Sequence, residues 1–167
     1  MLIGGIAVIA RGVTRQTDDV DATVWAPGLD VTVAVEHLEA SGIVGRIDDL
    51  LQFAEISQVL LLRHEPSGTP MEVSLAWLPF EQTALDRAER LELGGASIPV
   101  ATAEDLIIYK AIAWRERDRI DIERLANLHG PSINRDRIVN VVSQLAAALE
   151  EPQRVVELVR LLDSVEG

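Results

Sequence analysis

The chain has 167 residues, a formal net charge of −12, a pI near 4.6 and no cysteine. The length fits one domain, and 48% hydrophobic but only 4% aromatic residues indicate a core of Leu, Ile, Val and Ala. The lack of cysteine excludes disulfides and thiolate chemistry, the three scattered histidines exclude a His-rich zinc site, and the acidic charge argues against a broad basic face for nucleic acid.

The first hundred residues predict a mixture of strands and helices. Alternation of Val20, Ala22 and Val24 with polar residues is typical of a strand with one buried face, so these valines and the alanine are expected to point into the core. The expected elements are a short strand at Leu2 and Ile3, a helix over 6–11, a strand over 19–25, helical segments over 31–40 and 47–56, strands over 59–64 and 71–77 joined by a turn, a helix over 80–88, and two short strands over 91–100.

The remainder of the chain is helical by pattern. Thr102 is expected to cap a helix that carries Lys110, a charged helix over 117–128 follows, Asn134 is expected to cap the next helix, and Pro152 opens the last one. The fold class is therefore α/β (α+β), with a small mixed β-sheet core over residues 1–101 and a helical C-terminal part over residues 102–167 packed on it.

Two aspartates on the strand over 19–25 are the first candidate site residues. Side chains two positions apart on a strand point to the same face, so Asp19 and Asp21 present their carboxylates together. Carboxylate oxygens are the ligands that Mg²⁺ prefers in proteins. The pair therefore predicts a metal site.

The residues before these aspartates are suited to phosphate. Gly4 and Gly5 let a phosphate approach the backbone closely, and the first amides of the following helix can donate to it. The Arg15 guanidinium and the Thr17 hydroxyl, just upstream of the aspartates, can neutralise or orient phosphate oxygens. Glycines, arginine, threonine and aspartates together predict a Mg-nucleotide site.

The stretch LIGGIAVIARGVTRQTDDVDATV resembles the opening motif of the nucleotidyltransferase superfamily, which has the polymerase-beta-like fold. Within it, the resemblance is to the small abortive-infection-type toxin nucleotidyltransferases. Two later blocks, over 98–110 and 115–122, match the second half of that group, so the resemblance spans roughly Leu2 to Leu125. Members of the group usually have a helix ahead of the glycine pair, whereas this chain begins almost on it.

The resemblance implies a role for each matching position. Gly4 and Gly5 would contact nucleotide phosphate, and Asp19 and Asp21 would hold Mg²⁺ or Mn²⁺. Lys110 would reach the active site from its helix. Asp118 or Asp121 would support that lysine. From the residues alone, Lys110 is more typical of a surface lysine on an amphipathic helix, and the charged stretch over 115–124 is typical of a self-paired helix face.

One position departs from the family pattern. Where complete members carry a third acidic residue in a Val-Asp-Leu context, this chain has Ser74 between Val73 and Leu75. The third carboxylate normally helps to bind a second metal and to deprotonate the attacking hydroxyl. Glu72 lies two residues earlier on the same expected strand, shares the face of Ser74, and is a candidate catalytic substitute.

The favoured function is Mg-dependent transfer of a nucleoside monophosphate from a nucleoside triphosphate to an unidentified acceptor hydroxyl. The alternative is a degenerate domain that binds nucleotide or a protein partner without catalysis, in a toxin and antitoxin pair. A carboxylate-pair hydrolase is disfavoured, because its two carboxyl groups must flank a bond. The acidic charge disfavours tRNA as the acceptor. The apolar stripe of the last helix leaves open the formation of a homodimer. A cytoplasmic location without membrane insertion is expected.

Overall fold

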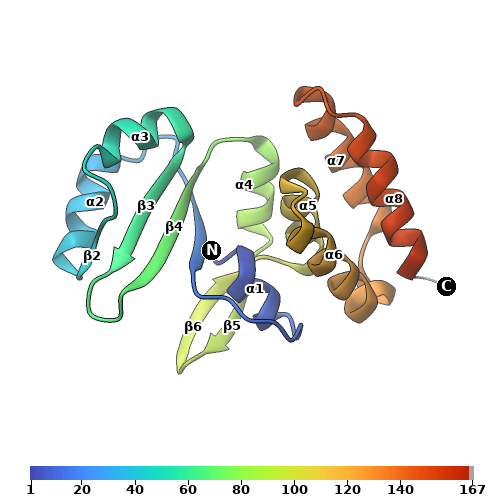
Figure 1. Cartoon of the computed structure of the whole chain (residues 1–167), viewed down its shortest axis with the longest axis horizontal. Coiled ribbons are helices and arrows are strands. Elements are labelled where there is room, and N and C mark those ends of the chain that lie inside the picture. Colours follow the sequence, from blue (N-terminus) through green and yellow to red (C-terminus); the bar gives the residue numbers. More distant parts are fainter. Residues whose placement is uncertain (166–167) are drawn as a thin grey trace. The chain divides into compact units, whose positions relative to one another are not determined.

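The structure, a computed structural model, describes residues 1–165 and divides into two compact units. The sheet unit consists of residues 1–6 and 15–100, and the helical unit of residues 7–14 and 101 onward. Helix α1 (Gly4–Ala10) contributes residues to both units. Figure 1 shows the strands in the first unit and the helical C-terminal part in the second, which is the α/β class expected from the sequence. In the described residues, no helix has both the length and the apolar character needed to cross a bilayer.

A four-stranded mixed sheet forms the centre of the sheet unit. Strands β1 and β4 are parallel, whereas β4 pairs with β3, and β3 with β2, in antiparallel fashion. The resulting strand order is β1-β4-β3-β2. The strand bounds are β1 (Val20–Trp25), β2 (Ile43–Gly45), β3 (Val59–His64) and β4 (Thr69–Ala76).

The hydrophobic core of this unit lies between the sheet and two helices, α2 (Val31–Ala40) and α3 (Leu50–Ser57). Its buried members come from both helices and from β3 and β4: Val35, Leu50, Ala54, Leu60, Leu62 and Leu75. No residue of the edge strand β1 belongs to this cluster. The remaining elements are α4 (Pro79–Asp86), which packs near β1, and the antiparallel pair β5 (Glu89–Leu93) and β6 (Ala96–Val100).

The buried face of β1 differs from the expected one. Thr23 is 2% exposed and its hydroxyl donates to the Ser74 carbonyl oxygen at 3.3 Å, whereas Val24 is 36% exposed. The expectation that Val24 points into the core was therefore wrong. Because β1 is an edge strand, the α2–α3 layer covers its neighbours and leaves Val24 in contact with solvent.

The other edge of β1 is covered by the first residues of the chain. The Ile3 amide donates to the Asp21 carbonyl at 3.0 Å, and the Thr23 amide donates to the Met1 carbonyl at 2.9 Å. Leu2 bridges Ala22 on one side and Val100 of β6 on the other, so the expected strand at Leu2 and Ile3 is a single bridge. The Met1 ammonium donates to the Thr23 carbonyl, and desolvation by burial lowers its pKa. Asp21 is thus fixed from both sides.

The helical unit is built around the side chains of α5 (Ala103–Ala113) and α6 (Glu116–His129). As expected, Thr102 and Asn134 are N-caps, because the Thr102 side chain accepts from the Asp105 amide and that of Asn134 from the Arg137 amide. The unit is completed by the short η1 (Gly130–Ser132), α7 (Arg135–Ala148) and α8 (Gln153–Val165). Its fully buried large side chains include Leu106, Ile107, Ile108, Ile122, Leu125, Ile138, Val142 and Leu158.

Candidate active site

The glycine pair forms the first turn of α1, so this helix begins at Gly4 rather than at Ile6 as expected. Gly4 has a φ of +61°, a conformation that L side chains rarely adopt. A Cβ placed on Gly4 would come within 2.5 Å of the Asp21 Cβ and would overlap its carboxylate. Glycine is therefore required here both by the backbone and by the close approach of Asp21.

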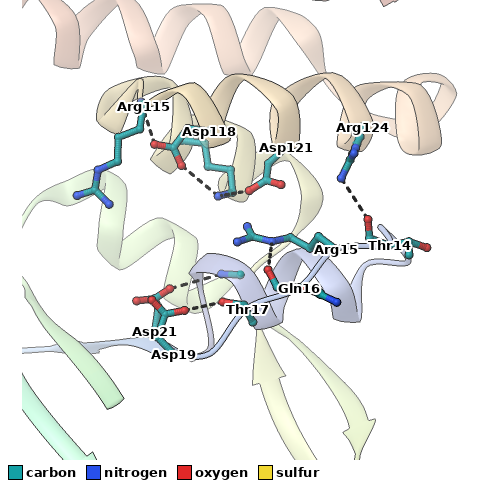
Figure 2. A network of polar contacts seen from close by, with 12 residues as sticks. Thr14, Arg15, Gln16, Thr17, Asp19, Asp21, Arg115, Asp118, Asp121 and Arg124 are labelled. Carbon is teal, nitrogen blue, oxygen red and sulfur yellow. Dashed lines mark hydrogen bonds and ion pairs between the residues drawn. The ribbon is translucent and has the colours of Figure 1, made fainter. Parts of the chain in front are cut away.

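The Asp21 carboxylate lies against this turn. Its Oδ2 accepts a hydrogen bond of 3.4 Å from the Gly5 amide. The amide of Gly5, a residue that the sequence suggested as a point of close phosphate approach, thus has a carboxylate partner in this structure. Figure 2 shows the Asp21 and Asp19 carboxylates on the same side of the chain, close to the turn.

Thr17 links Asp19 to the same turn. Its hydroxyl donates to Asp19 Oδ1 at 2.5 Å, and a Cβ on Gly5 would come within 2.8 Å of the Thr17 Cβ (Figure 2). The Arg15 guanidinium also lies beside Gly5, since one of its terminal nitrogens is 3.2 Å from the Cβ that Gly5 lacks. The structure therefore brings together six residues that the sequence singled out: Gly4, Gly5, Arg15, Thr17, Asp19 and Asp21.

Glu72 and Ser74 lie on the strand next to β1, as the sequence argument required. In the parallel register Glu72 is opposite Asp21 and Ser74 is opposite Thr23. Side chains at paired positions point to the same face of a sheet, so Glu72 shares the face of Asp21. Glu72 is the acidic residue of β4 that the register places beside the site.

The side chain of Glu72 is engaged by a residue that the sequence did not indicate. Arg46 follows β2, and its guanidinium contacts Glu72 Oε1 at 2.9 Å. No local sequence pattern predicts this ion pair, because its two residues are 26 positions apart. They come together only through the pairing of β2 with β3 and of β3 with β4.

The oxygen ligands for a metal are limited in number. In residues 1–165, no three acidic or histidine side chains gather closely enough to hold one ion. Mg²⁺ usually keeps several waters and is bound by one or two carboxylates together with substrate phosphates. Asp19 and Asp21 beside a turn that admits no Cβ fit that mode of binding, with water and phosphate completing the shell.

Lys110 is the only lysine in the chain, and it is buried in the helical unit. Its Nζ lies 2.7 Å from Asp121 Oδ2 and 3.2 Å from Asp118 Oδ1. Asp118 also accepts from the Arg115 amide at 3.0 Å, at the start of α6. Lys110 is thus no surface lysine. Of the charged stretch over 115–124, Asp118 and Asp121 are the acidic residues that turn inward.

A second buried charge network joins the starts of α5 and α7. Arg137 contacts Asp105 at 2.5 Å and Glu104 at 3.4 Å, and Asp105 also accepts from the Thr102 hydroxyl at 2.6 Å. Asp105 is fully buried. Because every one of these charges has a partner within the helical unit, this network serves to hold two helices together.

The match of the chain to a family model agrees with the motif. Among curated proteins, none is significantly similar to the chain. Of solved structures, the chain is similar to the crystal structure of an antigenic nucleotidyltransferase-like protein from Paracoccidioides brasiliensis, with 15% identity, 97% of this chain and 83% of that chain covered, and a TM-score of 0.47. The model of the family described as "Nucleotidyltransferase of unknown function (DUF6036)" matches residues 1–163. With nearly its whole length matched, the chain belongs to this nucleotidyltransferase family.

Proposed function

We propose that this protein transfers a nucleoside monophosphate from a nucleoside triphosphate to an acceptor hydroxyl in a Mg²⁺-dependent reaction, with pyrophosphate leaving. The observation that carries the proposal is the position of Asp21 in a member of this family. Its carboxylate lies on the Gly4–Gly5 turn, next to the Thr17–Asp19 pair, and its strand neighbour in register is Glu72.

Asp19 and Asp21 are the residues that would hold the metal ion, Mg²⁺ or Mn²⁺. When bound, such an ion neutralises charge on the phosphate oxygens during transfer. Its ligands have to be on one side of the chain, and the contacts of Thr17 with Asp19 and of Gly5 with Asp21 hold both carboxylates at the same turn.

The phosphates of the nucleotide are assigned to the residues around this turn. Arg15 supplies a guanidinium beside Gly5, and guanidinium groups recognise phosphate through paired hydrogen bonds. The Thr17 hydroxyl and the backbone at Gly4 and Gly5 complete this set. Because neither glycine has a side chain, Asp21, Thr17 and Arg15 can all approach the backbone at one place.

Glu72 and Lys110 take the remaining roles. Glu72 replaces the missing third carboxylate, since it shares the face of Asp21 and can accept the proton of the acceptor hydroxyl. Lys110 stabilises the negative charge that develops in transfer. In the helical unit its ammonium group is held by Asp118 and Asp121, the supporting role proposed for these aspartates.

A second candidate function is supported by Ser74. Serine stands at the position of the third carboxylate and is in register with Thr23, two residues further along β1 than Asp21. If Glu72 does not replace it, the domain binds Mg-nucleotide, or a protein partner such as an antitoxin, without transfer. Both forms of this second function lack turnover, and only the form that binds Mg-nucleotide shares nucleotide binding with the transferase.

Incubation with labelled nucleoside triphosphates and Mg²⁺ tests the proposal. Water, nucleosides, a tRNA pool and the protein itself are offered as acceptors, and product is separated from pyrophosphate. We expect labelled product from the wild-type chain. In the double variant Asp19→Asn and Asp21→Asn, the rate of product formation should fall at least about a thousandfold, because the metal ion that stabilises the transition state is no longer held.

Asp18→Asn is the matched control, because Asp18 is an exposed neighbour of the same charge. It should retain activity within about threefold, less than 1 kcal/mol on the barrier. Calorimetric nucleotide binding without any product would select the non-catalytic function. Loss of product in Asp18→Asn equal to that in the double variant would refute the assignment of the metal to Asp19 and Asp21.

A further inference from the structure

Four residues form one row across the four-stranded sheet. Asp21 is in register with Glu72, and Glu72 is in register with Leu61. The row continues to Arg46, whose amide donates to the Leu61 carbonyl at 2.9 Å. Arg46 and Asp21 therefore lie on either side of Glu72, on the same face of the sheet.

The row contains two neighbouring negative charges, Asp21 and Glu72, and one positive charge, Arg46. Like charges directly opposite each other on paired strands repel, and Asp21 and Glu72 are such a pair. Arg46 reduces this repulsion on the Glu72 side, through its contact with Glu72 Oε1 at 2.9 Å. Within the described part of the chain, this ion pair is the one polar contact of the Glu72 side chain.

The ion pair also involves the carboxylate that the register places nearest to Asp21. The register places Glu72 beside Asp21, yet Asp19, Asp21 and Glu72 do not form a group of three ligands in the described residues. A carboxylate committed to a guanidinium is not available to a metal ion through the same oxygen. The side chains of Arg46 and Glu72 are 30% and 46% exposed, so both can change partner without opening the core.

We propose that Arg46 is a positioning residue for Glu72: its guanidinium holds the Glu72 carboxylate in the metal-free protein and gives it up to a divalent cation held by Asp19 and Asp21. This inference rests on the proposed function, since it takes Glu72 as the third carboxylate. It adds that the site is assembled when the Glu72 carboxylate exchanges its guanidinium partner for the divalent metal ion.

Arg63 provides a matched comparison. It is an exposed arginine on β3, two residues from Leu61 and so on the same face, and the described structure gives its side chain no ion pair with Glu72. Arg46→Gln and Arg63→Gln remove the same charge from the same face. They differ in whether the lost guanidinium contacts Glu72.

The test is a titration of the full chain with Mn²⁺ in the absence of nucleotide, followed by electron paramagnetic resonance of the free ion. Removing a unit charge several ångströms from a divalent cation strengthens binding by about three- to tenfold in a solvent-screened setting. We expect this gain for Arg46→Gln and a gain below about twofold for Arg63→Gln, because the Arg63 guanidinium forms no ion pair with Glu72 in the described structure and its exposed charge is screened by salt. Glu72→Gln added to Arg46→Gln should remove the gain.

Two results would overturn the inference. One is an equal effect of Arg46→Gln and Arg63→Gln, which shows a general change of charge. The other is weaker Mn²⁺ binding in Arg46→Gln, which shows that Arg46 orients Glu72 for the metal instead of withholding it. A failure of the proposed function gives a different result. In that case the double variant Asp19→Asn and Asp21→Asn would bind Mn²⁺ as tightly as the wild-type chain does.

Discussion

Two groups of charged residues, one in each unit, differ in how far they are buried. In the helical unit, the side chains of Lys110 and Asp121 are 7% and 4% exposed, and both carboxylates of the cluster are within 3.2 Å of one ammonium group. In the sheet unit, Arg46 and Glu72 are 30% and 46% exposed and form a single contact. Buried charges need their partners to keep the protein folded, whereas exposed charges can exchange partners at little cost.

This contrast separates residues that stabilise the fold from residues that are available to a ligand. It also means that the effect of a substitution on activity has to be measured beside its effect on stability. For Lys110 the two effects overlap, because its proposed role in transfer and its ion pairs involve the same ammonium group. For Arg46 they should be separable.

The largest expected effect is that of Lys110→Met. Methionine keeps much of the side-chain volume but removes the cation, so the buried carboxylates of Asp118 and Asp121 lose their shared ammonium partner. Breaking a buried ion pair in this way costs about 3–5 kcal/mol, which urea denaturation followed by circular dichroism measures directly. A loss below about 1 kcal/mol would be typical of a solvent-exposed lysine and would contradict the buried cluster.

The same cluster can be tested without a substitution. Because Lys110 is the only lysine, an amine-reactive reagent can modify only this side chain and the N-terminal amine. We expect mass spectrometry to show that Lys110 resists modification in the native protein and reacts in urea. Rapid native labelling at Lys110 would contradict its burial.

Gly4→Ala should have the next largest effect. Alanine must adopt a φ of +61°, and its Cβ must displace Asp21. The backbone cost is about 1–2 kcal/mol, and the displacement adds about 1–3 kcal/mol. Thermal and chemical denaturation measure the sum, and Mn²⁺ titration reports whether Asp21 has moved.

Gly94→Ala is the control for the backbone term. Gly94 has a φ of +59°, and nothing lies within 4 Å of its missing Cβ. Its free energy of unfolding should therefore fall only by the backbone term, about 1–2 kcal/mol, and it should bind Mn²⁺ as the wild-type chain does. If Gly4→Ala and Gly94→Ala behave alike, the close approach of Asp21 to the glycine turn is refuted.

The smallest expected effect on stability is that of Arg46→Gln. An exposed ion pair contributes about 0–1 kcal/mol, and salt screens it. Denaturation at low and high ionic strength should show a loss of less than about 1 kcal/mol that shrinks as salt is added. A loss above about 2 kcal/mol would mean that Arg46 belongs with the buried charges, and the contrast between the units would disappear.

Local signals predicted much of the fold. The N-caps at Thr102 and Asn134 lie where Thr and Asn precede a helical pattern, because capping depends on residues within one turn. The helix over 31–40 and the strand over 59–64 also have the expected bounds, since their apolar periodicity is clear. Strand β2 was missed, because Ile43 to Gly45 is too short to show a period and is a strand only through its pairing with β3.

The local sequence was enough to predict the site residues Gly4, Gly5, Arg15, Thr17, Asp19 and Asp21, because all lie within 18 consecutive residues that end at Asp21. Their spacing along one turn and one strand determines which side chains can act together. Three features depended on the assembled protein: the burial of Lys110 between Asp118 and Asp121, the exposure of Val24 instead of Thr23, and the hold of Arg46 on Glu72. Each arises from contacts between separate elements. Neither the periodicity nor the spacing of residues in one element determines which other helix or strand packs against it.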